Sequence, residues 1–150
     1  MNPAFSSRFR FSDWPNPEVP NVAAGVYAIW HDEQLIYCGM SGRELEKALE
    51  AKKSRYGLVT RLESHSRGRL SGDQFCVYVA NRIVIPTLRA NQLHQFAAGK
   101  LSLDLLTKQH IQRHFEYQYA VVHSSRAAYA LESECRSGIV FGKLPLLNPS

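Results

Sequence analysis

The chain has 150 residues, 45% of them hydrophobic, so it is the size of one ordinary domain and can bury a core of its own. Its 18 lysines and arginines exceed its 13 aspartates and glutamates by five, which favours a polyanionic partner. No apolar run approaches the roughly 20 residues that a membrane-spanning helix needs, and the N-terminus lacks the apolar core of a signal peptide. We therefore expect a cytoplasmic protein without a membrane partner.

The first 22 residues differ from the rest in composition. Pro15, Pro17 and Pro20 follow a stretch that is rich in phenylalanine and arginine. Because proline disfavours a helix, Met1 to Val22 is predicted to be an extended arm, and residues 23–150 are predicted to form a single domain. The aromatic side chains of the arm either contact nucleic acid or, as is commoner, pack onto the domain.

Two short segments rich in β-forming residues follow the arm. They are Gly25 to Trp30 and Leu35 to Cys38, and the polar residues His31 to Gln34 between them have the composition of a tight turn. This pattern predicts a β-hairpin. Its strands are antiparallel neighbours, so Tyr27 and Tyr37 can lie close enough to place two phenols beside one site. The alternative is that both tyrosines only pack the sheet.

A first helix is predicted directly after the hairpin. Ser41-Gly42-Arg43-Glu44 has the form of a capping box, in which a serine and a glutamate three positions apart satisfy free backbone groups. We expect the helix to continue through Glu50 or beyond.

A second helix, which carries Leu58 and Leu62 on one face, is predicted from near Tyr56, and Gly68 is its predicted stop. Arg61 and His65 lie four positions apart, so they share one face of this helix. The segment around it is strongly basic and carries only one acidic residue, Glu63. Its basic residues are Lys52, Lys53, Arg55, Arg61, Arg67 and Arg69.

The middle of the chain is predicted to contain a third strand and a helical insertion. Phe75 to Ala80 has the composition of a strand, and residues 86–114 contain two helical stretches, of which the second has Ser102 as a candidate cap. His110 and His114 have the i,i+4 spacing of a helical metal site. The sequence marks no third ligand, so the metal interpretation is the weaker one.

A fourth strand and a last helix complete the predicted fold. Phe115 to Val122 alternates apolar and polar residues as a strand does, and a helix capped by Ser124 or Ser125 is expected to run to about Ser137. Together the elements predict an α/β (α+β) domain with a small, mainly antiparallel β-sheet flanked by helices.

The conjunction of five segments resembles the GIY-YIG nuclease family, which includes the nuclease half of a bacterial excinuclease, some homing endonucleases and some restriction enzymes. The resemblance covers the chain from about Gly25 to Asn148. Val26 and Cys38 stand where the family more often has isoleucine, at strand positions that tolerate such a change. The segments are Gly25-Val26-Tyr27, Ile36-Tyr37-Cys38-Gly39, Gly57 to His65, Glu132, and Pro145 to Asn148.

The resemblance implies a metal-dependent endonuclease that hydrolyses DNA phosphodiester bonds. Tyr27 is the first choice for general base and Tyr37 for positioning the water or the phosphate, and the two roles can be exchanged. Because the unperturbed pKa of tyrosine is near 10, a tyrosine base requires nearby cations. Arg61 would hold the scissile phosphate through its fork of donors, and His65 would assist proton transfer or bind phosphate.

The resemblance also implies a single acidic metal ligand on the last helix. Glu132 fits this position best, with Glu134 as the fallback, and one carboxylate suits a one-metal site for Mg²⁺, or Mn²⁺ in its place. The two glutamates lie about 200° apart around the helix, so both cannot face the same site. Without a metal role, Glu132 would only pair with Arg136. Asn148 is expected to position the glutamate helix or the groups of the site.

The partner implied by the resemblance is DNA, either branched or duplex, and nothing in the sequence identifies a protein partner. The alternative is a catalytically inactive nucleic-acid-binding module of a repair, recombination or defence system. Under both hypotheses the residues expected to contact the backbone phosphates are Lys52, Lys53, Arg55, Arg67 and Arg69.

Overall fold

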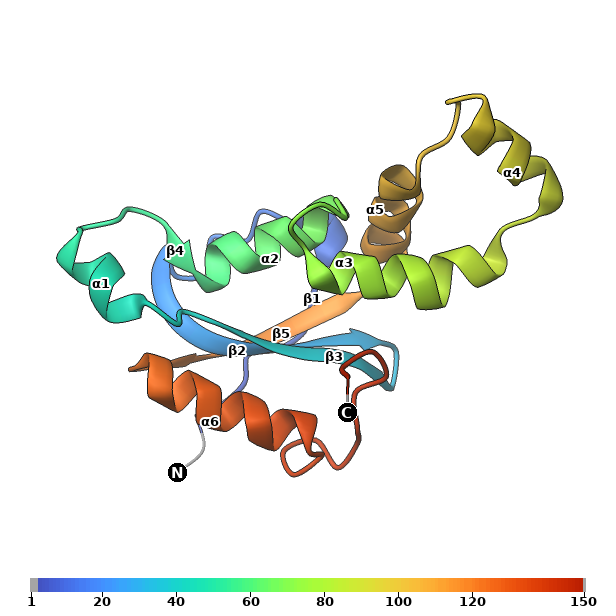
Figure 1. The fold of residues 1–150 in the computed structure, drawn as a ribbon. Helices are drawn as coiled ribbons and strands as arrows, with labels where there is room; N and C mark the ends of the chain where they lie inside the picture. The colour runs from blue at the N-terminus through green and yellow to red at the C-terminus, as the bar shows by residue number, and fades with distance from the viewer. Residues whose placement is uncertain (1–2, 150) are drawn as a thin grey trace.

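The computed structural model describes residues 3–149, in which a β-sheet has helices on both faces (Figure 1). The strands are β1 (Phe9–Arg10), β2 (Val22–His31), β3 (Gln34–Ser41), β4 (Tyr56–Gly57) and β5 (Glu116–Val122). The helices are α1 (Leu45–Glu50), α2 (Leu58–Arg67), α3 (Gln74–Val79), α4 (Ala90–Ala97), α5 (Leu103–His114) and α6 (Ser125–Arg136).

The sheet is mainly antiparallel, as predicted. Its strand order is β1-β5-β2-β3, and the short β4 pairs in parallel with the start of β2. Antiparallel pairs join β1 to β5, β5 to β2, and β2 to β3. The predicted α+β class is therefore confirmed.

The predicted hairpin is formed by β2 and β3. His31 pairs with Gln34, so the turn consists of Asp32 and Glu33, and Asp32 has a φ of 51°. Aspartate tolerates this left-handed conformation better than most residues, and tight hairpin turns require it. The strands extend beyond the predicted limits and include Val22 and Ser41 at their far ends.

The two faces of β2 bury separate apolar clusters. Tyr27 and Ile29 face a cluster that includes residues of α2, α3 and α5. Val26 and Ala28 face the other cluster, to which α6 contributes Leu131. Residues 23–30 are all buried, because helices cover both sides of the strand (Figure 1). Alternating side chains of a strand point to opposite faces, so one short segment supplies both cores.

The prediction of a strand over Phe75 to Ala80 is wrong, because these residues form α3 and continue into a π-helical turn at Ala80–Val84. The β-branched and aromatic composition was misleading. The deciding signal is Asp73, whose side chain accepts a hydrogen bond from the backbone N–H of Cys76 and caps the helix. Burial of Phe75, Cys76, Val79 and Ala80 follows a helical period.

The predicted capping box after the hairpin is also wrong. Ser41 still belongs to β3, Gly42 has a φ of 100°, and α1 begins only at Leu45. At its start, the backbone N–H of Glu44 donates to the hydroxyl oxygen of Tyr56, 2.8 Å away. A tertiary contact therefore replaces the expected local cap.

The other predicted helix boundaries agree closely with the structure. α2 ends at Gly68, which has the left-handed conformation of a C-cap with a φ of 66°. Ser102 caps α5, and Ser124 rather than Ser125 caps α6. The helices α4 and α5 lie in the predicted insertion, and α4 projects away from the sheet (Figure 1).

The arm packs onto the sheet through its aromatic residues. Phe11 is 1% exposed and its ring centroid lies 4.8 Å from that of Tyr117, while Phe9 belongs to the short strand β1, which pairs with β5. The packing interpretation of these side chains is confirmed. Within residues 3–149, no helix is both long enough and apolar enough to cross a membrane.

Candidate active site

The two tyrosines of the hairpin lie on the same face of the sheet. Tyr27 pairs with Gly39 and Ile29 pairs with Tyr37, which places the tyrosines on a diagonal, and their ring centroids are 6.3 Å apart. Tyr27 is only 2% exposed, whereas Tyr37 is half-buried. The predicted proximity of the two phenols is therefore confirmed, and Tyr37 is the one nearer to solvent.

Gly25 and Gly39 are required by close packing around Tyr27. A Cβ atom on Gly39 would collide with the hydroxyl oxygen of Tyr27 and would lie 2.5 Å from its Cζ atom. A Cβ atom on Gly25 would collide with the carbonyl oxygen of Ala120 and would lie 2.5 Å from a methyl carbon of Leu58. The glycines of the two hairpin motifs thus have a steric role, which is to let the Tyr27 ring and α2 lie directly on the sheet.

A buried chain of hydrogen bonds starts at Tyr27. Its hydroxyl lies 2.8 Å from Nε2 of His65, and Nδ1 of the same imidazole lies 2.7 Å from Oδ2 of Asp73. The hydroxyl of Ser64 also donates to this Oδ2, at 2.6 Å, while Oδ1 accepts from the backbone N–H of Cys76. Tyr27, His65 and Asp73 are each 2% exposed. The chain therefore joins β2, α2 and the start of α3 inside the protein.

The protonation states in this chain follow from its surroundings. Burial would raise the pKa of Asp73, but hydrogen bonds from His65, Ser64 and the Cys76 N–H hold it well below its usual range. Burial lowers the pKa of His65, and this outweighs the opposing effect of Asp73. Burial and the neighbouring Tyr37 raise the pKa of Tyr27. At neutral pH, Asp73 is therefore ionised, while His65 and Tyr27 are neutral.

These states fix the direction of each hydrogen bond. Ionised Asp73 can only accept, so the proton of neutral His65 is on Nδ1 and Nε2 accepts from the Tyr27 hydroxyl. A proton can then pass from the phenol to the imidazole. The resulting imidazolium would be stabilised by the adjacent carboxylate.

His65, Asp73 and Cys76 form a cluster with metal-ligand chemistry, but its hydrogen bonds argue against a metal there. Their candidate ligand atoms lie within 4.8 Å of one another. However, both imidazole nitrogens of His65 already have hydrogen-bond partners, and the 2.7 Å between Nδ1 and Oδ2 leaves no room for an ion between them. Burial also raises the pKa of the Cys76 thiol well above its usual range, so the thiol is protonated.

Arg61 is an exposed residue of α2, one helical turn before the buried His65. Its positive charge opposes the rise that burial causes in the pKa of Tyr27 and adds to the lowering that burial causes in the pKa of His65, so it acts on the buried chain from the surface. Among residues 3–149, Arg61 forms no ion pair within 4.0 Å. The guanidinium is therefore free to bind an anion close enough to act on Tyr27 and His65.

The predicted basic surface is exposed, but part of its charge is neutralised. Lys52, Lys53 and Arg69 are exposed, as are Arg55 and Arg67. Glu63 approaches both of the last two, with N···O distances of 3.2 Å to Arg55 and 3.6 Å to Arg67. The single acidic residue of the segment thus pairs with two of the predicted phosphate contacts.

Glu132 lies on α6, which packs against the opposite face of the sheet from α2 (Figure 1). Its negative charge nevertheless helps to raise the pKa of Tyr37 to about 12, after burial of that ring, because Tyr37 lies on the edge strand β3. Burial raises the pKa of Glu132 itself. Within the described part of the chain, its carboxylate has no hydrogen bond or ion pair.

The surroundings of Glu132 fit a single-carboxylate metal site better than those of Glu134. Glu132 lines a pocket to which Glu134 does not contribute. Its half-buried oxygens have no donors among the described residues, so a cation that keeps several of its waters could bind there. The other residues of the pocket are Arg43, Tyr129, Ser133 and Arg136.

Asn148 is bound to the backbone of the edge strand. Its Oδ1 accepts from the N–H of Cys38 and its Nδ2 donates to the carbonyl of the same residue, both at 2.8 Å. Leu146 and Leu147 donate to the carbonyls of Leu35 and Ile36. The C-terminal segment therefore pairs along β3 beside Tyr37, and a guanidinium nitrogen of Arg136 on α6 holds the carbonyl of Pro149 at 2.9 Å.

Three residues of this region were not among the predicted site residues. Asp73 could have been found as a helix cap, but the strand prediction hid it. Tyr78, with its ring centroid 6.4 Å from that of Tyr37, lies on the same misassigned segment. Arg136 was considered only as a partner of Glu132.

Searches of this chain against protein-family models, curated proteins and solved structures found no match.

Proposed function

We propose that this protein is a metal-dependent endonuclease that hydrolyses DNA phosphodiester bonds at the edge of its sheet, with Tyr27, Tyr37 and Arg61 acting from one face and Glu132 from α6 on the other. The supporting observation is the buried Tyr27–His65–Asp73 chain. A tyrosine that only packs a sheet does not need an ionised aspartate behind it, and burying that charge is costly. A proton acceptor does need such a group.

Tyr27 is the proposed general base. As its oxygen takes a proton from the attacking water, its own proton passes to Nε2 of His65, and the imidazolium is held by Asp73. This route avoids a free tyrosinate, which burial would strongly disfavour. Because Tyr27 is 2% exposed, we expect the water to approach from the side of Tyr37.

Arg61 and Tyr37 are the proposed substrate-positioning groups. Arg61 is exposed and can donate two parallel hydrogen bonds to a phosphate, which neutralises charge that develops during attack. Tyr37 stays protonated because its pKa is about 12, so it acts as a hydrogen-bond donor rather than as a base. The partial exposure of Tyr37 suits contact with water or phosphate.

Glu132 is the proposed ligand for one divalent cation, Mg²⁺ or Mn²⁺. Such an ion, when bound, would act as a Lewis acid on the leaving 3′-oxygen. Burial raises the pKa of Glu132, and the charge of Arg136 in the same pocket opposes this rise. The exposed lysines and arginines around α2 would hold the DNA backbone through contacts that weaken with salt.

The first test is cleavage of supercoiled plasmid and of a branched duplex, with Mg²⁺ or with EDTA. We expect the wild-type protein to nick DNA only with the metal, and Tyr27→Phe and Glu132→Gln to lose at least about 100-fold in rate. Tyr117→Phe is the matched control, since its ring lies on the same face of the sheet but beside the arm. Glu134→Gln tests the fallback ligand.

The outcomes separate the nuclease from a binding module. Salt-sensitive DNA binding without cleavage would contradict the nuclease and support a catalytically inactive nucleic-acid-binding module. Absence of both activities, in protein shown to be folded, would contradict both proposals. Loss of cleavage in Glu134→Gln but not in Glu132→Gln would move the metal to the fallback position.

A further inference from the structure

Three histidines from distant parts of the sequence meet on the side of the sheet where the hairpin turn approaches α5. His110 and His114 lie one turn apart near the end of α5, and His31 lies at the end of β2. We propose that His31, His110 and His114 form a binding site for a divalent transition-metal ion, with Zn²⁺ as the best fit. This proposal is independent of the proposed nuclease activity.

The separations of two of the three ring pairs, both involving His114, match those of imidazoles that share one metal. The centroids of His110 and His114 are 4.6 Å apart, and those of His31 and His114 are 5.3 Å apart. A zinc ion binds imidazole nitrogen at about 2.0–2.1 Å in a tetrahedral arrangement, which places two ligand rings about 5 Å apart. The interplanar angles, 48° and 51°, show that neither pair is stacked face to face.

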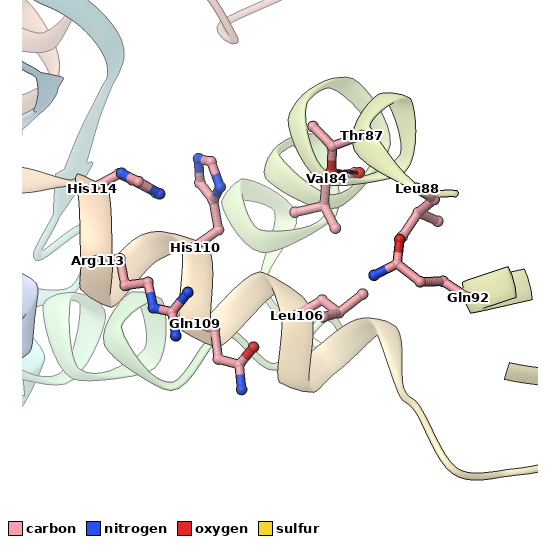
Figure 2. A pocket seen from close by; sticks show the side chains of 9 residues that line it. All are labelled: Val84, Thr87, Leu88, Gln92, Leu106, Gln109, His110, Arg113 and His114. Atoms are coloured by element: carbon pink, nitrogen blue, oxygen red, sulfur yellow. Dashed lines mark hydrogen bonds between the residues drawn. The ribbon is translucent and has the colours of Figure 1, made fainter. Parts of the chain in front are cut away.

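His110 provides the second observation. Its Nε2 atom is buried and has no hydrogen-bond partner among the described residues, although buried polar atoms normally have one. Figure 2 shows the rings of His110 and His114 on the same side of α5, beside a pocket that Val84 and Leu106 also line. A lone pair on this nitrogen would be satisfied by a metal ion.

The charges around the cluster are compatible with a cation. The carboxylate of Asp32 lies 3.8 Å from Nε2 of His31, and Asp32 also lines a pocket together with His114 and Glu116. Arg113, which borders both pockets, and Arg10, which lines the second, are opposing positive charges.

Binding requires a local side-chain adjustment. The candidate ligand atoms of the three histidines do not all lie within 4.8 Å of one another. Within residues 3–149, the only group of three whose ligand atoms are that close is the buried cluster of His65, Asp73 and Cys76. His114 is exposed and the side chain of His31 is 40% exposed, so both rings can rotate toward His110. Three imidazoles favour Zn²⁺ over Mg²⁺, which prefers oxygen ligands. A bound ion would tie the hairpin turn to α5.

The test is the binding of Zn²⁺ to the untagged full-length protein, measured by calorimetry in excess Mg²⁺ so that sites for hard cations are filled. We expect one Zn²⁺ per chain, and a loss of affinity in His31→Ala and in His114→Ala of more than the roughly 10–100-fold that removal of a supporting group costs. Zn²⁺ should also raise the melting temperature of the wild type but not of these variants. His94→Ala is the control, because His94 is exposed on α4.

Three results would overturn the proposal. The first is absence of Zn²⁺ binding by the wild type at micromolar free zinc. The second is unchanged affinity in His31→Ala and His114→Ala, and the third is loss of the ion in Cys76→Ala while both histidine variants keep it. The two substituted histidines are partly or fully exposed, so metal-free variants should fold. Equal melting temperatures without metal would verify this.

Discussion

The two faces of β2 are built from different chemistry. On one face, Tyr27 carries a buried polar chain that ends at the charge of Asp73. On the other face, Val26 and Ala28 pack against α6 in a purely apolar cluster that includes Leu131. One face of β2 therefore supports a core that depends on hydrogen bonds, and its other face supports a core that depends on the close packing of apolar side chains.

The difference between the faces predicts how each responds to mutation. A buried polar network is stabilising only when all its members are satisfied, so the loss of one partner affects the others. An apolar core loses stability in proportion to the volume that is removed, without a specific loss of chemistry. Substitutions in the polar chain on the Tyr27 face should therefore affect activity, and substitutions in the apolar core beneath α6 should affect mainly stability.

The largest expected effect is that of Asp73→Asn. The amide of asparagine would donate toward Nδ1 of His65, which moves the imidazole proton to Nε2 and blocks its acceptance of the Tyr27 proton. We expect the cleavage rate to fall by about 10²–10⁴-fold at pH 7. Single-turnover cleavage of a labelled duplex, corrected for the folded fraction, measures this loss.

Leu131→Ala is the matched substitution on the opposite face. Leu131 is 4% exposed, so its truncation should cost about 2–5 kcal/mol of unfolding free energy while leaving the cleavage rate per folded molecule within about threefold of wild type. Denaturant unfolding and the same cleavage assay give both numbers. An equal loss of rate in Leu131→Ala and Asp73→Asn would contradict the division between the faces.

Gly39→Ala tests the packing that holds the Tyr27 phenol. The new methyl group would collide with the phenol, so we expect a loss of about 1–3 kcal/mol in unfolding free energy through overpacking. Gly72→Ala is the control, since Gly72 has a φ of 77° but no atom lies within 4 Å of its added Cβ. It should lose only the roughly 1–2 kcal/mol of left-handed strain, without loss of cleavage. A Gly39→Ala protein with normal cleavage would show that the phenol is not held there.

Local patterns in the sequence were sufficient to predict the hairpin, α2 and α6. Alternation and turn chemistry predicted that Tyr27 and Tyr37 would be neighbours, and the i,i+4 rule placed Arg61 and His65 on one helix. These features depend on residues that are close in sequence, so short-range rules can predict them.

The polar chain and the histidine cluster could not be predicted in this way. Asp73 reaches His65 because the loop after α2 brings the start of α3 back to the end of α2. Composition did not reveal this, since the β-prone residues at 75–80 are helical because Asp73 caps them and the sheet buries them. His31 meets His114 across 83 positions, through tertiary packing alone. Propensity is a weak guide where such packing decides the structure.

The buried histidine should also make stability depend on pH. The folded-state pKa of His65 is lowered from 6.5, so its stabilising contribution is present above pH 6.5 and is lost as the pH falls. We expect the unfolding free energy to decrease below pH 6.5 by up to about 1.4 kcal/mol per pH unit from this group. His110, whose pKa falls to about 4, acts in the same direction, while Glu132, whose pKa burial raises, acts oppositely near 4.5.

Urea unfolding at pH 7.5, 6.5 and 5.5 measures this dependence. His65→Gln should flatten the slope, because the unfolded chain then gains one proton fewer over the same range. His94→Gln, on exposed α4, should keep the wild-type slope. Constant stability of the wild type from pH 7.5 to 5.5 would contradict the neutral, buried imidazole on which the proposed proton route depends.

The smallest expected effect concerns the exposed side of α2, whose inner side carries His65. Glu63→Gln would release Arg55 and Arg67 from a pair that is open to solvent, so the loss of stability should be below about 1 kcal/mol. Nonspecific DNA binding should instead become stronger, with a salt dependence steeper by about one to two phosphate contacts. Fluorescence anisotropy between 50 and 200 mM salt, with the exposed Glu50→Gln as control, measures the change. Weaker binding in Glu63→Gln would indicate that the DNA binds on another surface, because the released guanidinium groups of Arg55 and Arg67 would then not contact its phosphates.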